Sequence, residues 1–330
     1  MEIDNVDRNL LNIIQSVFPL SREPFSLLEL SLDIPAVEVI DRVARLKTAG
    51  IIRLIGPVLN PQEMGYRTTL VAAEVTSEKL DMAGQVISGH PLVSHCYQRD
   101  HELNLWLTLA VAVTASLEDE VRKLGIQIKS RTILNLPAIK TFKIGAFFGG
   151  EGKKSNLPSP TGRGKIDQAT GVDHLSTVER AVINTLQQDL PLNERPFDSI
   201  SGELKMDADE FLGYCQALLR RGIMRRFSAS VNHNKLGYRA NAMVCWQMPL
   251  DGMNNIGKKI STFSEVSHCY QRQANSLWPY NLFAMVHAHN KGNCRAVIDR
   301  ICLEAGLDKN TGVVLFSSRE LKKTRVRYKV

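Results

Sequence analysis

The chain has 330 residues, of which 44% are hydrophobic and 23% charged, a composition typical of a soluble globular protein with two or more domains. Its net charge of +7 is uneven, because residues 1–150 carry 15 basic and 17 acidic residues whereas residues 173–330 carry 22 and 15. A basic second half predicts a polyanionic partner, such as nucleic acid, anionic lipid or a polycarboxylate ligand.

Several locations and site types are disfavoured by the sequence. The longest strongly apolar run, near 103–113, is well short of the ~20 residues that cross a bilayer. The N-terminus is acidic and lacks the apolar core of a secretory signal. The six cysteines form no C-x-x-C pair, which disfavours a disulfide framework or a zinc site. We therefore expect a reduced, cytoplasmic chain with no membrane partner.

The first 150 residues predict two successive modules. Apolar residues recur at helical spacing in 4–17, 26–32 and 35–49, and the following segment 51–60 reads as a wing. This order is typical of a winged helix-turn-helix. The next segments alternate in the βαββαβ order of a ferredoxin-like domain. They are a strand at 68–75, a helix at 79–88, strands at 93–99 and 103–113, a helix at 117–128 and a strand region at 133–148.

The second half of the chain repeats the first at an offset of 172 to 173 residues. Seven consecutive residues, VSHCYQR, occur both at 93–99 and at 266–272. The second copy has helices at 176–188, 198–204 and 207–221, a wing at 223–232, strands at 242–248, 266–272, 281–289 and 312–318, and helices at 254–262 and 294–305. The sequence therefore predicts an α+β tandem repeat that pairs as an internal pseudo-heterodimer.

The repeat fixes the expected domain boundaries. Residues 150–172 are rich in Gly, Ser, Pro and Lys and predict a flexible linker. The winged helix-turn-helix domains are expected at 1–62 and 173–234, and the ferredoxin-like domains at 63–149 and 235–330.

A winged helix joined to a ferredoxin-like domain resembles the Lrp/AsnC family of regulators. SHCYQR, WPYNLF and RELKKTRVRY together resemble the siroheme decarboxylases, in which two related Lrp-like polypeptides act as a pair. The resemblance covers nearly the whole chain outside the linker, with both partners fused. It implies non-oxidative loss of the C12 and C18 acetate carboxyl groups of siroheme, giving 12,18-didecarboxysiroheme for heme d1 or siroheme-dependent heme. It implies no cofactor, because the iron belongs to the substrate.

The repeated strand carries the first group of candidate residues. Because side chains alternate along a strand, His268, Tyr270 and Arg272 share one face, and His95, Tyr97 and Arg99 share the equivalent face. We expect this polar face to point away from the helices, into the space between two paired sheets. Arginine suits bidentate contact with the carboxylates of an eight-carboxylate macrocycle. The alternative interpretation is a solvated sheet face or a structural hydrogen-bond network.

Differences between the copies favour the second as the main active site. His287 and His289 lie on one face of 281–289, and Ala110 stands opposite His287 in the first copy. The second copy also has an insertion at 276–280 containing Trp278, a substrate-binding candidate with both histidines. We expect no resident metal; an axial contact to substrate iron would come from His268 or His287.

The second wing adds three further substrate-binding candidates, Arg225, Arg226 and His233. The double arginine suits ring carboxylates, although a solvated wing or a phosphate contact remains the alternative. Related chains often carry Arg beside the wing histidine, where this chain has Asn232.

The expected chemistry assigns His268 as the general acid, Tyr270 as a hydrogen-bond donor and Arg272 as the residue that orients carboxylates. One alternative function is a DNA-binding regulator. It is disfavoured because the recognition helix of the second copy begins with Asp207, Asp209 and Glu210, which repel phosphates, so we expect no nucleic-acid partner. A non-catalytic heme or siroheme binder is the second alternative. A further homodimer stays open.

Overall fold

The computed structural model describes residues 3–145 and 174–330, which form two compact units. The first contains residues 3–65, 174–236 and 328–330, and the second contains residues 66–145 and 237–327. The predicted linker at 150–172 lies outside the described residues. Within these residues, no helix has the length and apolar character needed to cross a membrane.

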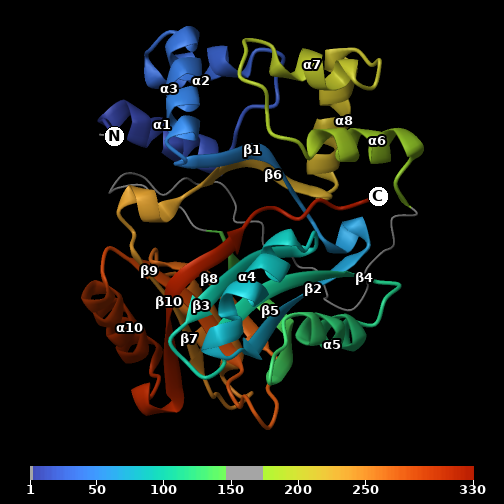
Figure 1. Cartoon of the computed structure of the whole chain (residues 1–330). Coiled ribbons are helices and arrows are strands. Elements are labelled where there is room, and N and C mark those ends of the chain that lie inside the picture. The colour runs from blue at the N-terminus through green and yellow to red at the C-terminus, as the bar shows by residue number, and fades with distance from the viewer. Residues whose placement is uncertain (1–2, 146–173) are drawn as a thin grey trace. The chain divides into compact units, whose positions relative to one another are not determined.

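The first unit holds the two helix-turn-helix modules (Figure 1). Their helices are α1 (Asn5–Ser16), α2 (Pro24–Leu32), α3 (Ala36–Thr48), α6 (Thr177–Leu186), α7 (Pro196–Gly202) and α8 (Ala208–Arg220). Asp4 caps α1 by accepting from the Asp7 amide at 2.7 Å, and Ser176 and Glu179 form a capping box at α6. The side chains of Phe18, Phe25, Phe197 and Phe227 meet in the core of this unit.

The two segments predicted as wings are single strands that pair with each other. Strand β1 (Ile52–Leu59) runs antiparallel to β6 (Met224–Val231), from the pair Ile52–Val231 to the pair Leu59–Met224. Register shifts make Arg53 and Arg225 bulge residues at equivalent positions. Each strand satisfies the backbone groups on the facing edge of the other.

The second unit contains both ferredoxin-like motifs. The first repeat supplies β2 (Tyr66–Glu74), α4 (Leu80–Gly89), β3 (Val93–Arg99), β4 (Leu105–Ala112), α5 (Leu117–Gln127) and β5 (Thr132–Ile144). The second supplies β7 (Ala240–Trp246), α9 (Met253–Ser261), β8 (Val266–Arg272), β9 (Leu282–Ala288), α10 (Lys291–Ala305) and β10 (Gly312–Lys323). Short 3-10 turns at Ser77–Lys79 and Lys309–Thr311 lie within this unit, whereas those at Gln62–Met64 and His233–Leu236 belong to the first unit. The predicted βαββαβ order is confirmed in both repeats.

Two long strands join the sheets into a closed barrel of order β10-β3-β4-β2-β5-β8-β9-β7. The first part of β5 pairs with β2 and its last part, from Ala138, pairs with β8. Likewise β10 pairs with β7 up to Phe316 and with β3 from Ser317. The halves therefore pair as predicted, and each repeat completes the sheet of the other.

Glycines let each long strand pack on the helix of the opposite repeat. A Cβ added at Gly257 of α9 would lie 2.5 Å from the Phe142 ring of β5. At the equivalent position, a Cβ on Gly84 of α4 would lie 3.3 Å from Leu321 of β10. The absence of a side chain at these two positions permits the close approach.

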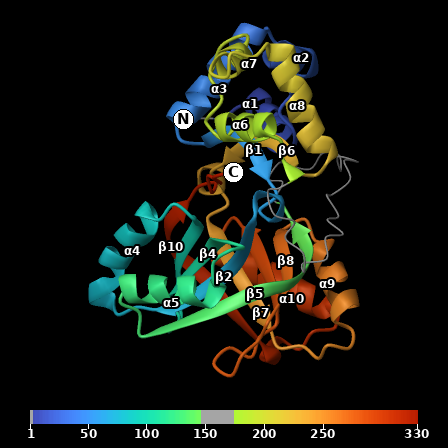
Figure 2. The ribbon, with the colours of Figure 1, turned by 90° about the vertical axis from the view of Figure 1, so that its right-hand side faces the viewer.

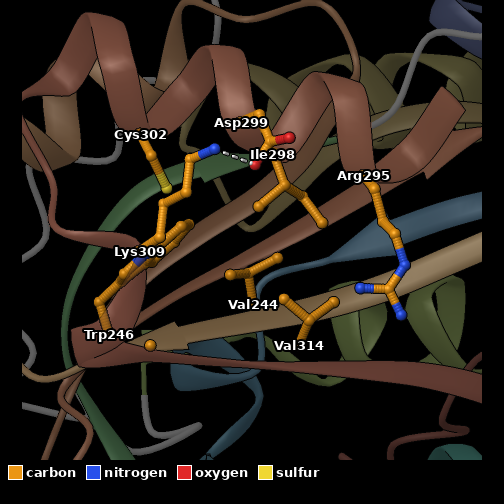
Figure 3. Close-up of a pocket in the computed structure, with 9 residues that line it drawn as sticks. Val244, Trp246, Arg295, Ile298, Asp299, Cys302, Lys309 and Val314 are labelled. Atoms are coloured by element: carbon orange, nitrogen blue, oxygen red, sulfur yellow. Dashed lines mark ion pairs between the residues drawn. The ribbon is translucent and has the colours of Figure 1, made fainter. Parts of the chain in front are cut away.

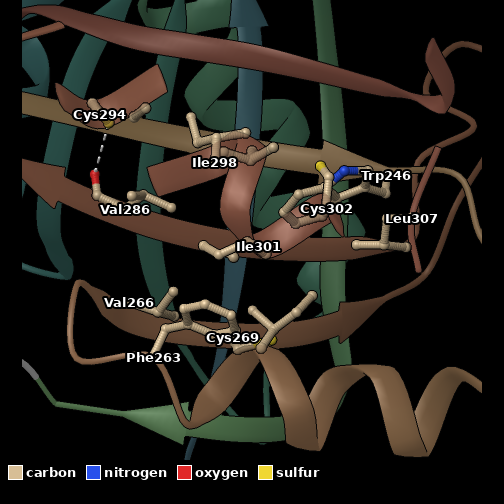
Figure 4. Packing of buried hydrophobic residues seen from close by; sticks show 14 of the residues in the cluster. Trp246, Phe263, Val266, Cys269, Val286, Cys294, Ile298, Ile301, Cys302 and Leu307 are labelled. Carbon is tan, nitrogen blue, oxygen red and sulfur yellow. Dashed lines mark hydrogen bonds between the residues drawn. The ribbon is translucent and has the colours of Figure 1, made fainter. Parts of the chain in front are cut away.

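The helices cover the outside of the barrel, with α4 and α5 on one side and α9 and α10 on the other (Figure 2). One apolar cluster lies under each helix pair, and the one beneath α9 and α10 includes Trp246, Cys269, Ile298 and Ile301 (Figure 4). A third cluster, containing Trp106, Met243, Phe283 and Leu315, fills the barrel interior. Each sheet therefore has one face against helices and one face inside the barrel.

Candidate functional site

The repeated VSHCYQR strands place their polar side chains on the interior face of the barrel. Cys96 and Cys269 belong to the helix-side clusters, and the Cys269 thiol reaches the Gly257 carbonyl of α9. The guanidinium groups of Arg99 and Arg272 lie on the opposite face, where they contact residues of the interior cluster. The predicted orientation of these strands is confirmed.

Arg99 and Arg272 make equivalent contacts across the two seams of the barrel. Arg272 Nη1 donates to the Leu136 carbonyl of β5 at 2.8 Å, and Arg99 Nη1 donates to the Leu315 carbonyl of β10 at 2.7 Å. The Arg272 guanidinium lies 4.6 Å from the centre of the Tyr270 ring. Burial lowers the pKa of each arginine to about 10.

These two guanidinium groups are incompletely satisfied. Arg99 and Arg272 are 4% and 8% exposed, and the Nε atom of each is buried without a hydrogen-bond partner among the described residues. None of the ion pairs within residues 3–145 and 174–330 gives either arginine a carboxylate. Two buried cations with open donors suit an anionic ligand, and their contact with substrate carboxylates stays a prediction.

Three polar side chains of the second repeat form a hydrogen-bonded group. Ser267 Oγ is 2.8 Å from His268 Nδ1 and 2.7 Å from His287 Nε2. Ser267 and His287 are buried, whereas His268 is half-buried. In the first repeat, Ser94 Oγ lies 2.9 Å from His95 Nδ1. A methyl group on Ala110 replaces the third member there, so the two repeats differ in the chemistry they can carry out.

The other candidate residues of the second repeat lie apart from this hydrogen-bonded group. His289 follows the end of β9, is exposed, and stacks on Tyr238 at 4.7 Å. Trp278 lies beyond the Arg272 end of β8, and the four residue steps from His268 to Arg272 extend about 13 Å along a strand. Trp278 is 2% exposed and packs on Trp106 at 5.0 Å, so it forms part of the barrel core.

The candidates from the second wing belong to the first unit. Arg225 donates to Asn60 Oδ1 at 2.9 Å from its bulge position. Burial, followed by the charge of Arg225, lowers the pKa of Arg226. Neither arginine has a carboxylate partner among the ion pairs of the described residues. His233 begins the 3-10 turn that follows β6, and it is half-buried.

A small cavity of about 160 Å³ lies between α10 and strands β7 and β10 (Figure 3). Its walls include Val244, Val314 and the ion pair of Lys309 with Asp299, 2.7 Å apart. The cavity is on the helix side of the sheet and is below the ~300 Å³ of small-molecule sites. Among the described residues, no cluster of three His, Cys, Asp or Glu side chains could hold a metal ion.

Ser267 and Asn241 were not among the sequence candidates. Asn241 pairs with His287 in the register of β7 and β9, and its Oδ1 is buried without a hydrogen-bond partner among the described residues. The repeated Ser-His dipeptide was the available signal for Ser267. No local pattern marks Asn241, because only the strand register brings it beside His287.

Comparison with known proteins gives matches over both repeats. A model described as an AsnC-like ligand binding domain matches residues 63–143 and 235–322. A model described as a siroheme decarboxylase NirDL-like HTH domain matches residues 7–53 and 179–225. These ranges follow the predicted order of the modules.

Full-length relatives share the fused arrangement. The siroheme decarboxylase of Hydrogenobacter thermophilus is 36% identical over 321 residues, which cover 97% of this chain and 93% of the relative. The crystal structure of the siroheme decarboxylase NirDL superposes with a TM-score of 0.71 at 33% identity, covering 99% of this chain and 95% of that one. A crystal structure of NirDL with an iron-uroporphyrin III analogue gives a TM-score of 0.70 at 32% identity, with the same coverage.

Proposed function

The chain belongs to the siroheme decarboxylase family, and from this premise we propose that it removes the C12 and C18 acetate carboxyl groups of siroheme. The products are 12,18-didecarboxysiroheme and two molecules of CO2. The reaction is that of a carboxy-lyase, and it serves heme d1 or siroheme-dependent heme assembly. The six cysteines are free thiols, which suits a cytoplasmic enzyme.

The observation that carries the substrate proposal is a set of buried cations without protein anions. Arg99 and Arg272 are each desolvated enough to lower the pKa, and no carboxylate among the described residues pairs with them. Siroheme presents eight carboxylates around an apolar ring, so it supplies both the missing anions and an apolar surface. Arginine meets a carboxylate with two parallel hydrogen bonds, which fixes the orientation of the ring substituents.

The same residues suggest how an acetate is prepared for reaction. Phe283 stands opposite Tyr270 and Met285 opposite His268 in the register of β8 and β9. These apolar neighbours disfavour the charged acetate, while the Tyr270 hydroxyl and Arg272 hold it in place. Breaking the bond between the methylene and carboxylate carbons releases neutral CO2 and leaves the electron pair on the substrate.

Protonation completes the reaction. The conjugated macrocycle holds the electron pair until His268 donates a proton to the new methyl carbon. Each decarboxylation therefore consumes one proton and forms one C–H bond, with no external oxidant or reductant. His268 is half-buried, so solvent can return its proton before the second acetate reacts.

The test is anaerobic incubation with siroheme, followed by mass analysis of the tetrapyrrole. We expect the loss of two CO2 units with wild-type protein, and retained binding but little CO2 release with His268→Ala. Tight binding without any change in mass would support a non-catalytic siroheme carrier. Full turnover by His268→Ala would remove that residue as the proton donor.

DNA binding is disfavoured by the recognition helices. Asp207 caps α8 by accepting from the Asp209 amide at 2.8 Å, and Glu210 follows in the first turn. In the first repeat, Arg42 of α3 is held by Asp4 at 2.7 Å and by Asp7 at 3.0 Å. We expect no salt-sensitive gel shift with genomic fragments, whereas a sequence-selective shift would support a regulator.

A further inference from the structure

The Ser267 hydroxyl contacts two imidazole rings at once. Its Oγ lies 2.8 Å from His268 Nδ1 and 2.7 Å from His287 Nε2. A hydroxyl has a single proton, so it donates to one of these nitrogens and accepts from the other. The protonation states of the two histidines are therefore linked through Ser267.

The burial of His287 determines which side chain donates in each of these two hydrogen bonds. His287 is 9% exposed, and a buried imidazole is more stable neutral than charged. A neutral His287 whose Nε2 accepts the Ser267 proton carries its own proton on Nδ1. Asn241 lies opposite in the strand register with a buried, unpartnered Oδ1, an acceptor on the neighbouring strand. Ser267 Oγ then accepts from the Nδ1–H of His268.

We propose that Ser267 and His287 are positioning residues that orient His268 and fix its proton-donating nitrogen as Nε2. The proposal rests on the proposed function, in which His268 is the general acid. With Nδ1–H held by Ser267, the ring cannot rotate freely about its side-chain bonds. The oriented hydroxyl also stabilises the charged imidazolium that delivers the proton, as an acceptor behind a catalytic histidine does.

The same geometry limits this arrangement to the second repeat. Ser94 and His95 reproduce the first contact, but Ala110 cannot accept the hydroxyl proton. Nothing at position 110 therefore directs the Ser94 hydroxyl toward accepting from His95. This assigns proton delivery to His268 and leaves His95 with a binding role.

The test compares Ser267→Ala and His287→Ala with the matched first-repeat variant Ser94→Ala. We expect kcat to fall about 10- to 100-fold in both second-repeat variants, the range for removing an orienting partner. The dissociation constant for siroheme, measured by absorbance titration, should change less than about threefold in Ser267→Ala, because Ser267 is assigned no substrate contact. Ser94→Ala should retain kcat within about twofold.

A conservative variant separates positioning from packing. His287→Gln keeps a side-chain oxygen that can accept from Ser267, and it should recover at least about fivefold of the kcat lost in His287→Ala. Wild-type kcat in Ser267→Ala, or an equal loss in Ser94→Ala, would overturn the proposal. If His287→Gln unfolds, the Ser267→Ala and Ser94→Ala pair still decides it. Inactive wild-type protein would instead refute the proposed function itself.

Discussion

Replacing Arg272 with Met tests why a charge is buried in the barrel. Burial lowers the pKa of Arg272 to about 10, which corresponds to a penalty of about 3 kcal/mol on the charged form. Methionine relieves this penalty and fills similar space. It also removes the hydrogen bond to the Leu136 carbonyl, which contributes about 2 kcal/mol, and the contact with the Tyr270 ring, which contributes about 1 kcal/mol. These effects nearly cancel.

We therefore expect Arg272→Met to change the free energy of unfolding by no more than about 1 kcal/mol, a Tm shift of about 2–4 °C. Siroheme binding should weaken about 10- to 100-fold, because a charge-assisted hydrogen bond contributes about 1.5–3 kcal/mol. Urea denaturation and absorbance titration measure the two quantities. Arg122→Met is the matched control, since Arg122 is 70% exposed and should affect neither.

The opposite pair of results would refute this reasoning. A loss of more than about 3 kcal/mol in stability, with unchanged siroheme affinity, would show that Arg272 stabilises the pairing of β8 with β5 and does not bind the substrate. Arg99→Met repeats the experiment at the other seam, where the guanidinium donates to the Leu315 carbonyl.

Three further predictions concern stability. Gly257→Ala should destabilise the protein by about 1–3 kcal/mol because the new Cβ meets the Phe142 ring. Gly213→Ala, in open space on α8, should instead stabilise the protein by up to about 1 kcal/mol. The Tm values of the two variants check both predictions. Asp7→Asn should cost about 3 kcal/mol in urea denaturation, because Asp7 is fully buried and binds both Arg42 and Arg45; a wild-type midpoint would contradict that role. The penalty on charged Arg272 is fully present below pH 10 and is relieved as pH rises above it. The stability of the wild type should therefore increase relative to that of Arg272→Met above pH 10, and parallel pH profiles would argue against this.

Periodicity and the internal repeat predicted most of the elements. Both VSHCYQR strands occupy the predicted residues, 93–99 and 266–272, because seven identical residues alternate between a helix side and an interior. Alternation also predicted that Tyr270 and Arg272 point away from the helices. These inferences rest on local geometry, which the sequence encodes directly.

The pairing of strands between the two repeats could not be predicted from local sequence patterns. A period of two indicates which face of a strand is buried and leaves its neighbours undetermined. Consequently β10 was predicted to end at 318, whereas it continues to Lys323 along β3. The partnership of β1 with β6 and the burial of Trp278 depend on the same long-range contacts. The contact of Ser267 with His287 also depends on strand pairing, because β9 places His287 beside β8.

The exchange of β5 and β10 also has a consequence for synthesis on the ribosome. Ser317 to Lys323 pair with Arg99 to His95, which are made more than 200 residues earlier. The outer edge of β3 therefore has no barrel partner until β10 has been made. An open strand edge invites pairing with other chains, and its closure carries the entropy of a very long loop. We expect folding intermediates that lack β10 to be the species most prone to aggregate.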